Sequence, residues 1–281
     1  MALVRILDLV KESVVRRRVV CAFNVFNATA IDAVLGAARE AGTPVILEAN
    51  EQDLYKVGIE ELVALTRIKA ERAGVDAALH LDHGMSIEVV AQCIRAGFTS
   101  VMIDPSRLAE GEKVARVRQV VDFARPVGVM VESMVGHLSL AAGLEGAAAE
   151  IEERTDPDQA ARFVEATGVD LLAVSVGTEH GSYIVGKKAE IDMAQLARIA
   201  QKVQIPLVVH GGSAVDDDQL RRVREHHVGK MNIGSALRVA YRRGMIEAFQ
   251  EGDRLDVQDA IDRARQRIQE VVLHKLRVLS C

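Results

Sequence analysis

The sequence predicts an α/β protein with the fold of a closed (β/α)8 TIM barrel and an extra C-terminal helix. Three observations favour this fold. Short apolar runs rich in β-branched residues alternate with longer segments of helical period along the 281 residues. Eight such units fit the roughly 250 residues of a typical barrel. An open, doubly wound sheet is the main alternative, but no GxGxxG motif follows the first expected strand, which favours the closed barrel.

The eight expected strands are continuous apolar runs, as is typical of strands that are buried on both faces. They cover residues 19–25, 44–48, 77–81, 100–103, 128–132, 171–176, 207–209 and 230–233. The segments of helical period that follow them cover residues 28–41, 59–73, 86–96, 109–123, 157–167, 193–203, 216–225 and 236–251.

Residues typical of helix ends support these boundaries. Gly42, Gly74 and Gly97 each follow a last helical turn, where glycine readily adopts the left-handed conformation that ends a helix. Asp156 and Pro157 open another helix, because Asp is a good capping residue and proline fits the first turn.

We expect residues 1–281 to form one domain, because no linker, repeat or low-complexity tract interrupts the alternation. An irregular segment, 135–153, follows the fifth strand on the face where barrels build active sites. Residues 253–279 form a long amphipathic helix beyond the eighth unit. We expect its apolar stripe to pack across the barrel bottom or against a second subunit, in a homodimer or homotetramer.

Composition and charge exclude several classes of function. The net charge is −5 and the pI about 5.9, which argues against nucleic acid or an anionic membrane as the main partner. Aromatic residues make up only 3% of the chain, too few for a base-stacking surface. The three cysteines lie far apart, as in proteins of a reducing compartment. No apolar run approaches the ~20 residues that cross a membrane, so we expect a cytoplasmic protein.

Three histidines stand at expected strand ends, and a glycine directly follows each one. His83, His180 and His210 close the third, sixth and seventh units, so a closed barrel brings them to one mouth. Neutral imidazoles suit zinc, and three protein ligands with an open position are typical of catalytic zinc. We therefore expect Zn²⁺ or another divalent transition metal there. His80 precedes its strand end, and we expect it to point away.

Gly/Ser turns after the last two strands indicate a phosphate site. Residues 210–213 read His-Gly-Gly-Ser and residues 232–235 read Asn-Ile-Gly-Ser. Backbone N–H groups at a helix N-terminus bind anions, and barrels often bind phosphate after strands seven and eight. Asp82 could transfer a proton, orient a ligand or cap the following helix. Asn24, at the end region of the first expected strand, and Glu132, which ends the fifth, complete the mouth.

The sequence resembles the class II, metal-dependent ketose-bisphosphate aldolases, which act on fructose or tagatose bisphosphate. The resemblance covers nearly the whole chain and includes AFNVFN (22–27), ALHLDHG (78–84), CIRAGFTSVMID (93–104), TDPDQAARFVEATGVDLLAVSVGTEHG (155–181), IPLVVHGGS (205–213) and KMNIGSALR (230–238). It implies that the three histidines bind zinc and that Asp82 moves the proton of the aldehyde-derived hydroxyl. The residues that it implies for the dihydroxyacetone-phosphate end are Gly181, Gly211, Ser213 and Ser235, with Asn232 at the reacting carbons.

The sequence departs from this family around the reacting carbons. A glutamate on the family's loop after strand five removes the donor proton, but the aligned positions here are Ala142 and Gly143. Met134 replaces the second glutamate of the family's strand five. The other departures are Glu48, Asn50, Pro105, Arg107 and Gly234. This pattern predicts a divergent member whose substrate is a phosphorylated ketose other than fructose 1,6-bisphosphate.

The missing acidic pair leaves the proton-abstracting base open. We expect Glu145, because it is nearest in sequence and loop closure can bring it to the substrate while excluding water. His137 is an alternative with an ordinary pKa near neutral pH. Glu48 and Glu132 could also reach the mouth from the second and fifth strands.

Three functions are compatible with these residues. The expected one is an aldolase-type carbon–carbon lyase that acts through the enediolate of a dihydroxyacetone-phosphate-like fragment. The second is an isomerase, epimerase or eliminating lyase that uses the same enediolate. The third is a non-catalytic paralogue that binds a sugar phosphate. The complete histidine set counts against the third, and the missing base counts for it.

Overall fold

The strands of the computed structural model form a closed barrel in the order β1-β2-β3-β4-β5-β6-β7-β8. Every neighbouring pair is parallel. The structure describes residues 3–137, 153–181, 183–184, 186–250 and 256–280. The strands are β1 (Val20–Asn24), β2 (Val45–Asn50), β3 (Ala77–Gly84), β4 (Ser100–Ile103), β5 (Met130–Val135), β6 (Leu171–Val174), β7 (Leu207–Val209) and β8 (Val228–Ile233).

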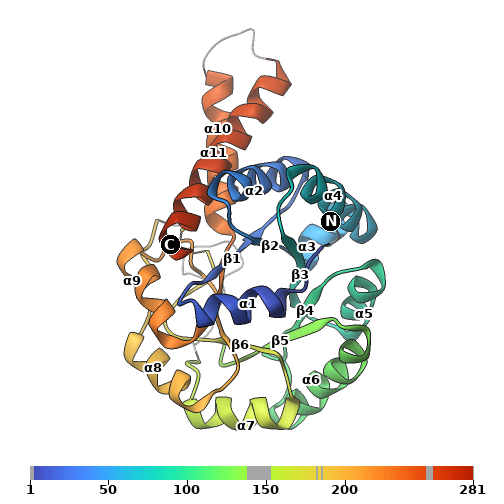
Figure 1. Cartoon of the computed structure of the whole chain (residues 1–281), viewed down its shortest axis with the longest axis vertical. Coiled ribbons are helices and arrows are strands. Elements are labelled where there is room, and N and C mark those ends of the chain that lie inside the picture. The colour runs from blue at the N-terminus through green and yellow to red at the C-terminus, as the bar shows by residue number, and fades with distance from the viewer. Residues whose placement is uncertain (1–2, 138–152, 182, 185, 251–255, 281) are drawn as a thin grey trace.

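Helices surround the barrel as a ring, and Figure 1 shows two of them, α10 and α11, projecting together beyond it. The α-helices are α1 (Ile6–Val15), α2 (Ala28–Ala41), α3 (Glu51–Val57), α4 (Ile59–Ala73), α5 (Ile87–Ala96), α6 (Glu110–Ala124), α7 (Pro157–Thr167), α8 (Met193–Lys202), α9 (Asp217–Arg222), α10 (Ser235–Gln250) and α11 (Val257–Leu279). Two 3₁₀ helices are η1 (Arg125–Val127) and η2 (Val223–His226). None of the described helices is long and apolar enough to cross a membrane.

The apolar strands are buried on both faces. Every residue of β1, β4, β5, β6, β7 and β8 is buried, because the helices cover the outer face and side chains fill the interior. The sequence prediction of a (β/α)8 TIM barrel with an additional C-terminal helix is therefore confirmed.

The predicted helix ends are also present. Gly42, Gly74 and Gly97 end α2, α4 and α5 in the left-handed conformation. The Asp156 side chain caps α7 by accepting a hydrogen bond from Gln159 N at 2.8 Å. These interactions involve residues only a few positions apart, so the helix ends can be predicted from the sequence.

Helix α1 was not predicted, and it closes the N-terminal end of the barrel. Its residues Ile6 and Val10 are fully buried among Val20, Ile46 and Ala78, which point into the barrel from β1, β2 and β3. Figure 1 shows α1 lying across that end. Only two of its ten residues are buried, so its apolar face is too narrow to stand out from the surrounding charges.

Because α1 occupies the barrel bottom, the expectation that the C-terminal helix packs there is wrong. Helix α11 instead packs along the side of the barrel against α10 and α2. Ala264, Ile268 and Val272 of its stripe are fully buried, whereas Val257 at its start is 56% exposed. The alternative, contact with a second subunit, remains a prediction.

Candidate active site

The C-terminal ends of β3 and β7 and the loop after β6 bring His83, His180 and His210 together. The nitrogen atoms that they could offer to a metal all lie within 4.8 Å of one another. The ring of His83 lies 4.9 Å, centroid to centroid, from each of the other two rings. Residues that are up to 127 positions apart in the chain thus form one cluster at the mouth of the barrel.

An irregularity in β3 directs His83 toward this mouth. The register of β3 against β4 shifts between Leu81 and Gly84, and His83 has a φ of 49°. Non-glycine residues rarely adopt this left-handed conformation, and bulges often turn a side chain toward an active site. Gly84 is required next to it, because an added Cβ would lie 2.6 Å from the backbone oxygen of Met102.

Carboxylates orient two of the imidazoles. His83 Nδ1 donates to Asp104 Oδ2 at 2.6 Å, and His210 Nε2 donates to Glu132 Oε1 at 3.0 Å. His83 Nε2 and His210 Nδ1 are left facing each other 3.1 Å apart. Nitrogens bound tetrahedrally to zinc at 2.0–2.1 Å lie about 3.4 Å apart, and zinc-binding histidines commonly donate their other N–H to a carboxylate. The donor set therefore fits a zinc-like ion.

The charges around the cluster also suit a cation. Burial alone would lower the pKa of His83, but the Asp82 and Asp104 carboxylates raise it to about 9. Burial, with His83 nearby, lowers the pKa of His180 to about 4. Burial lowers the pKa of His210 well below its ordinary value. Two of the imidazoles are thus neutral at pH 7, which is the form that binds metal ions.

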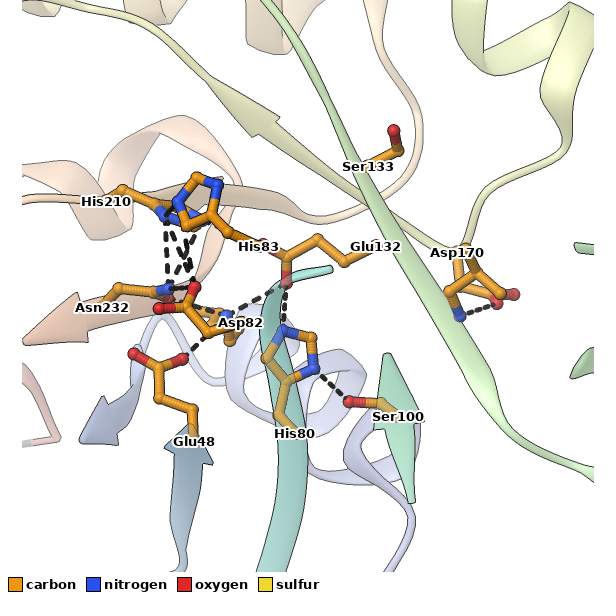
Figure 2. A network of polar contacts seen from close by, with 12 residues as sticks. Glu48, His80, Asp82, His83, Ser100, Glu132, Ser133, Asp170, His210 and Asn232 are labelled. Atoms are coloured by element: carbon orange, nitrogen blue, oxygen red, sulfur yellow. Dashed lines mark hydrogen bonds and ion pairs between the residues drawn. The ribbon is translucent and has the colours of Figure 1, made fainter. Parts of the chain in front are cut away.

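Asp82 lies beside the histidine cluster, held by two amide side chains. Asn24 Nδ2 donates to Asp82 Oδ2 at 2.9 Å, and Asn232 Nδ2 donates to Oδ1 at 3.2 Å (Figure 2). Burial would raise the pKa of Asp82, but the neighbouring His83 and His210 lower it to about 2. Asp82 is therefore ionised at neutral pH and able to accept a proton.

The residues predicted to hold phosphate line the same cavity as the histidines. This cavity has a volume of about 610 Å³. Ser213 Oγ accepts a hydrogen bond from Ala236 N, in the first turn of α10, at 3.2 Å. Gly211 has a φ of 76° and so requires glycine. The remaining two members of the set, Gly181 and Ser235, also line the cavity.

A buried polar network lies below the mouth, and it was not predicted from the sequence. Lys230 Nζ lies 3.0 Å from Glu132 Oε2 and 3.3 Å from Glu48 Oε2. His80 Nε2 lies 3.5 Å from Glu132 Oε2, and its Nδ1 contacts Ser100 Oγ (Figure 2). The expectation that His80 points away is therefore wrong. Because side chains alternate along a strand, the inward position of Asp82 was a signal that His80 also points inward.

The structure also changes the placement of the candidate bases. β5 continues to Val135, so Glu132 lies within the strand and is fully buried rather than at the strand end. Glu48 is fully buried as well, and neither carboxylate lines the cavity. His137 lines it. Glu145 lies outside the described residues.

Comparison with known proteins agrees with this geometry. The family model described as "Fructose-bisphosphate aldolase class-II" matches residues 4–281. The crystal structure of the YdjI aldolase from Escherichia coli K12 is 28% identical, with a TM-score of 0.86 over 99% of this chain and 97% of that one. A fructose-bisphosphate aldolase from Campylobacter jejuni has the same fold, with 20% identity and a TM-score of 0.81 over 99% of this chain and 95% of that one. The chain therefore belongs to the class II fructose-bisphosphate aldolase family, a family of aldolase-type lyases.

Proposed function

We propose that this protein is a metal-dependent aldolase that makes or breaks a carbon–carbon bond of a phosphorylated ketose other than fructose 1,6-bisphosphate. The observation that carries the proposal is that one cavity contains the three histidines, an ionised Asp82 and the N-terminus of α10. A phosphorylated small molecule is accordingly the proposed partner, rather than nucleic acid or a membrane.

His83, His180 and His210 are the proposed ligands of Zn²⁺ or another divalent transition metal ion. When bound, such an ion supplies Lewis-acid polarisation of the substrate ketone. Asp104 and Glu132 keep the two imidazoles oriented through the hydrogen bonds described above.

Asp82 is the proposed proton carrier at the hydroxyl group that becomes the aldehyde. In the cleavage direction Asp82 accepts the hydroxyl proton, the adjacent carbon–carbon bond breaks, and the electron pair stays on the dihydroxyacetone-phosphate fragment. A second group then protonates that carbon, and Glu145 is our proposal for it. Asn24 and Asn232 hold the Asp82 carboxylate in place and would also contact the substrate.

The phosphate of the ketose end is proposed to bind where Gly181, Gly211, Ser213 and Ser235 meet. The helix N-terminus there offers backbone N–H groups, and the serine hydroxyls add donors. The other walls support a substrate different from the usual one. Met134, whose thioether side chain is buried, lines the cavity at the position where other members of the family have a glutamate.

Deuterium exchange tests the proposal directly. The zinc-loaded protein is incubated with dihydroxyacetone phosphate in deuterated water, and the carbon that bears the hydroxyl should exchange its hydrogen. His210→Ala should lose both the metal and the exchange, whereas His274→Ala, a change at an exposed histidine, should lose neither. Exchange without condensation with any aldehyde would favour the isomerase, epimerase or eliminating lyase. No exchange by the metal-loaded protein would favour the non-catalytic paralogue.

A further inference from the structure

Lys230 is a fully buried charged group to which the proposed chemistry assigns no role. It lies in β8 two residues before Asn232, so the two side chains point to the same face of the strand, into the barrel. Burial would lower the pKa of Lys230, but the Glu132 and Glu48 carboxylates raise it. The side chain is therefore an ammonium group at neutral pH, with three N–H groups to donate.

One of these N–H groups determines how the Asn232 amide is oriented. Lys230 Nζ donates to Asn232 Oδ1 at 2.7 Å, which is shorter than its 3.0 Å hydrogen bond to Glu132 Oε2. At the other end of the amide, Asn232 Nδ2 donates to Asp82 Oδ1 at 3.2 Å and lies 3.3 Å from His210 Nδ1 (Figure 2). An ammonium can only donate and a carboxylate can only accept, so the reverse orientation of the amide would lose both hydrogen bonds.

The Asn232 amide thus presents its two N–H groups to the mouth of the barrel. One N–H is held by Asp82, and the other faces His210 Nδ1, which is a proposed metal-binding atom. A ring nitrogen that binds a metal ion no longer accepts a hydrogen bond, so in the loaded protein this N–H is available to an oxygen of the substrate. A donor aimed at an oxygen that gains negative charge stabilises the transition state. The donor is stronger when the oxygen of the same amide accepts from a cation.

We propose that Lys230 is a positioning residue that fixes and polarises the Asn232 amide, so that its N–H groups face Asp82 and the substrate oxygen that becomes negative. This inference rests on the proposed aldolase function. Lys230 does not line the cavity, and its hydrogen bonds and ion pairs among the described residues are with Asn232, Glu132 and Glu48. Its effect on the reaction is therefore transmitted by Asn232, and by Glu132 through the imidazole that this carboxylate orients.

Removing Lys230 requires a background in which the barrel still folds. Lys230→Met alone would leave the Glu132 carboxylate buried without its cation, which is strongly destabilising. Glu132→Gln removes that charge, and the oxygen of a glutamine can still accept from His210 Nε2. Lys230→Met is therefore made in Glu132→Gln protein, with and without Asn232→Ala. Urea denaturation and metal content show that each protein is folded and loaded before it is compared.

Deuterium exchange into dihydroxyacetone phosphate is the kinetic readout. When Asn232 is present, adding Lys230→Met should lower kcat for exchange by about 10- to 100-fold, a part of the roughly 10²–10³-fold that loss of a whole oxyanion donor costs. KM should change little, because the interaction strengthens only in the transition state. In Asn232→Ala protein, adding Lys230→Met should have no further effect, since the residue through which it acts is gone. Lys69→Met breaks an ion pair with Asp32 between α4 and α2 and should leave wild-type kcat and KM unchanged.

A second readout does not depend on activity. In metal-free Glu132→Gln protein with nitrogen-15 in its asparagine side chains, the Nδ2 resonance of Asn232 is identified by its loss in Asn232→Ala. This resonance should shift when Lys230→Met is added and should stay in place when Lys69→Met is added. An unmoved resonance, or an equal fall of kcat with and without Asn232→Ala, overturns the inference alone. A wild type that does not exchange deuterium overturns the proposed function, and the catalytic part of the inference with it.

Discussion

Glu48 and Glu132 face the same Lys230 ammonium inside the barrel, yet their environments differ. Glu132 accepts hydrogen bonds from Lys230 at 3.0 Å and from His210 at 3.0 Å. Glu48 Oε2 lies 3.3 Å from Lys230 Nζ, but off the direction of a hydrogen bond, and neither oxygen has another donor. Burial raises the pKa of Glu48 well above its ordinary value, against the opposing effect of Lys230. Asp82 and Glu132 raise it further.

Replacing Glu48 should therefore change how stability depends on pH. Between the ordinary pKa of 4.5 and the raised folded-state pKa, the folded protein keeps a proton that the unfolded chain has lost, so wild-type stability falls as pH rises. Glu48→Gln should match the wild type near pH 4.5 and exceed it by about 1.4 kcal/mol per pH unit across that window. Urea denaturation at pH 5, 6 and 7 measures this. Glu165→Gln, at an exposed position of α7, is the control. Parallel pH profiles for Glu48→Gln and the wild type would contradict the assignment.

The proton-abstracting base is a second question of single residues. Glu145→Gln should slow deuterium exchange into dihydroxyacetone phosphate by about 10²–10⁴-fold, because it removes the general base. Metal content, measured in the same preparation, should stay at the wild-type level. If Glu145→Gln exchanges at the wild-type rate and His137→Asn does not, the base is His137. If both variants remain active, the reaction does not begin with this proton abstraction.

At the scale of elements, α11 supports the loop between β7 and α9, which carries two of the four proposed phosphate residues, Gly211 and Ser213. Lys275 lies within α11 and is buried. Its ammonium donates to Gly212 O at 3.1 Å and to Val215 O at 3.3 Å, on either side of Ser213. Burial lowers the pKa of Lys275, because removing the ammonium from water is unfavourable. The hydrogen bonds to the two carbonyls offset this loss of hydration. A helix at the side of the barrel thus fixes a loop at its mouth.

Lys275→Met should loosen this loop. Two buried carbonyls would lose their donor, which lowers the free energy of unfolding by about 1–3 kcal/mol. Because Ser213 lies between these carbonyls, the KM for dihydroxyacetone phosphate should rise more than kcat falls. Chemical denaturation and initial-rate kinetics measure the two effects. His274→Ala, one residue away and exposed, should leave both unchanged. A loss of stability with an unchanged KM would restrict Lys275 to a structural role.

Elements with strong local signals could be predicted from the sequence, and those that depend on distant partners could not. Helices α2, α4 and α7 have the predicted bounds, since glycine and capping residues mark their ends. Helices α1 and α3 were missed. The length of β5 was underestimated, because its polar residues Glu132 and Ser133 read as the end of a strand. Both have buried polar partners on other strands: Glu132 contacts Lys230 of β8 inside the barrel, and Ser133 donates to the carbonyl oxygen of Ile103 on the neighbouring β4.

The residues of the candidate site also fall into those that could be predicted from the sequence and those that could not. The histidines could be predicted because a closed barrel brings strand ends together regardless of register. The carboxylates that orient them could not, because the contacts of Asp104 with His83 and of Glu132 with His210 depend on how four strands align. The need for glycine at position 234 also depends on a residue that is distant in the sequence, because an added Cβ would collide with the Asn24 side chain.

The whole barrel is layered along its axis. Its closed end is apolar, where α1 packs against inward side chains of the strands. The middle contains the network of Lys230 with Glu48 and Glu132, and the mouth contains the histidine cluster. The apolar layer at the closed end excludes water from the charged middle layer, where water would compete for the hydrogen bonds of Lys230 and its partners. This arrangement separates stability at one end from chemistry at the other.

The layering predicts that α1 contributes stability without contributing chemistry. Ile6 is 0% exposed and lies in the apolar layer, whereas Val15 on the same helix is 83% exposed. Ile6→Ala removes buried methyl groups and leaves a cavity, so it should lower the free energy of unfolding by about 2–5 kcal/mol. Val15→Ala should change it by less than about 0.5 kcal/mol. Urea denaturation measures both. Metal content and deuterium exchange at 25 °C should remain at wild-type levels in Ile6→Ala, since its contacts lie at the opposite end from the histidines. If Ile6→Ala lost metal while still folded, the closed end would be coupled to the mouth through the charged layer, and the two functions of the barrel would not be separable.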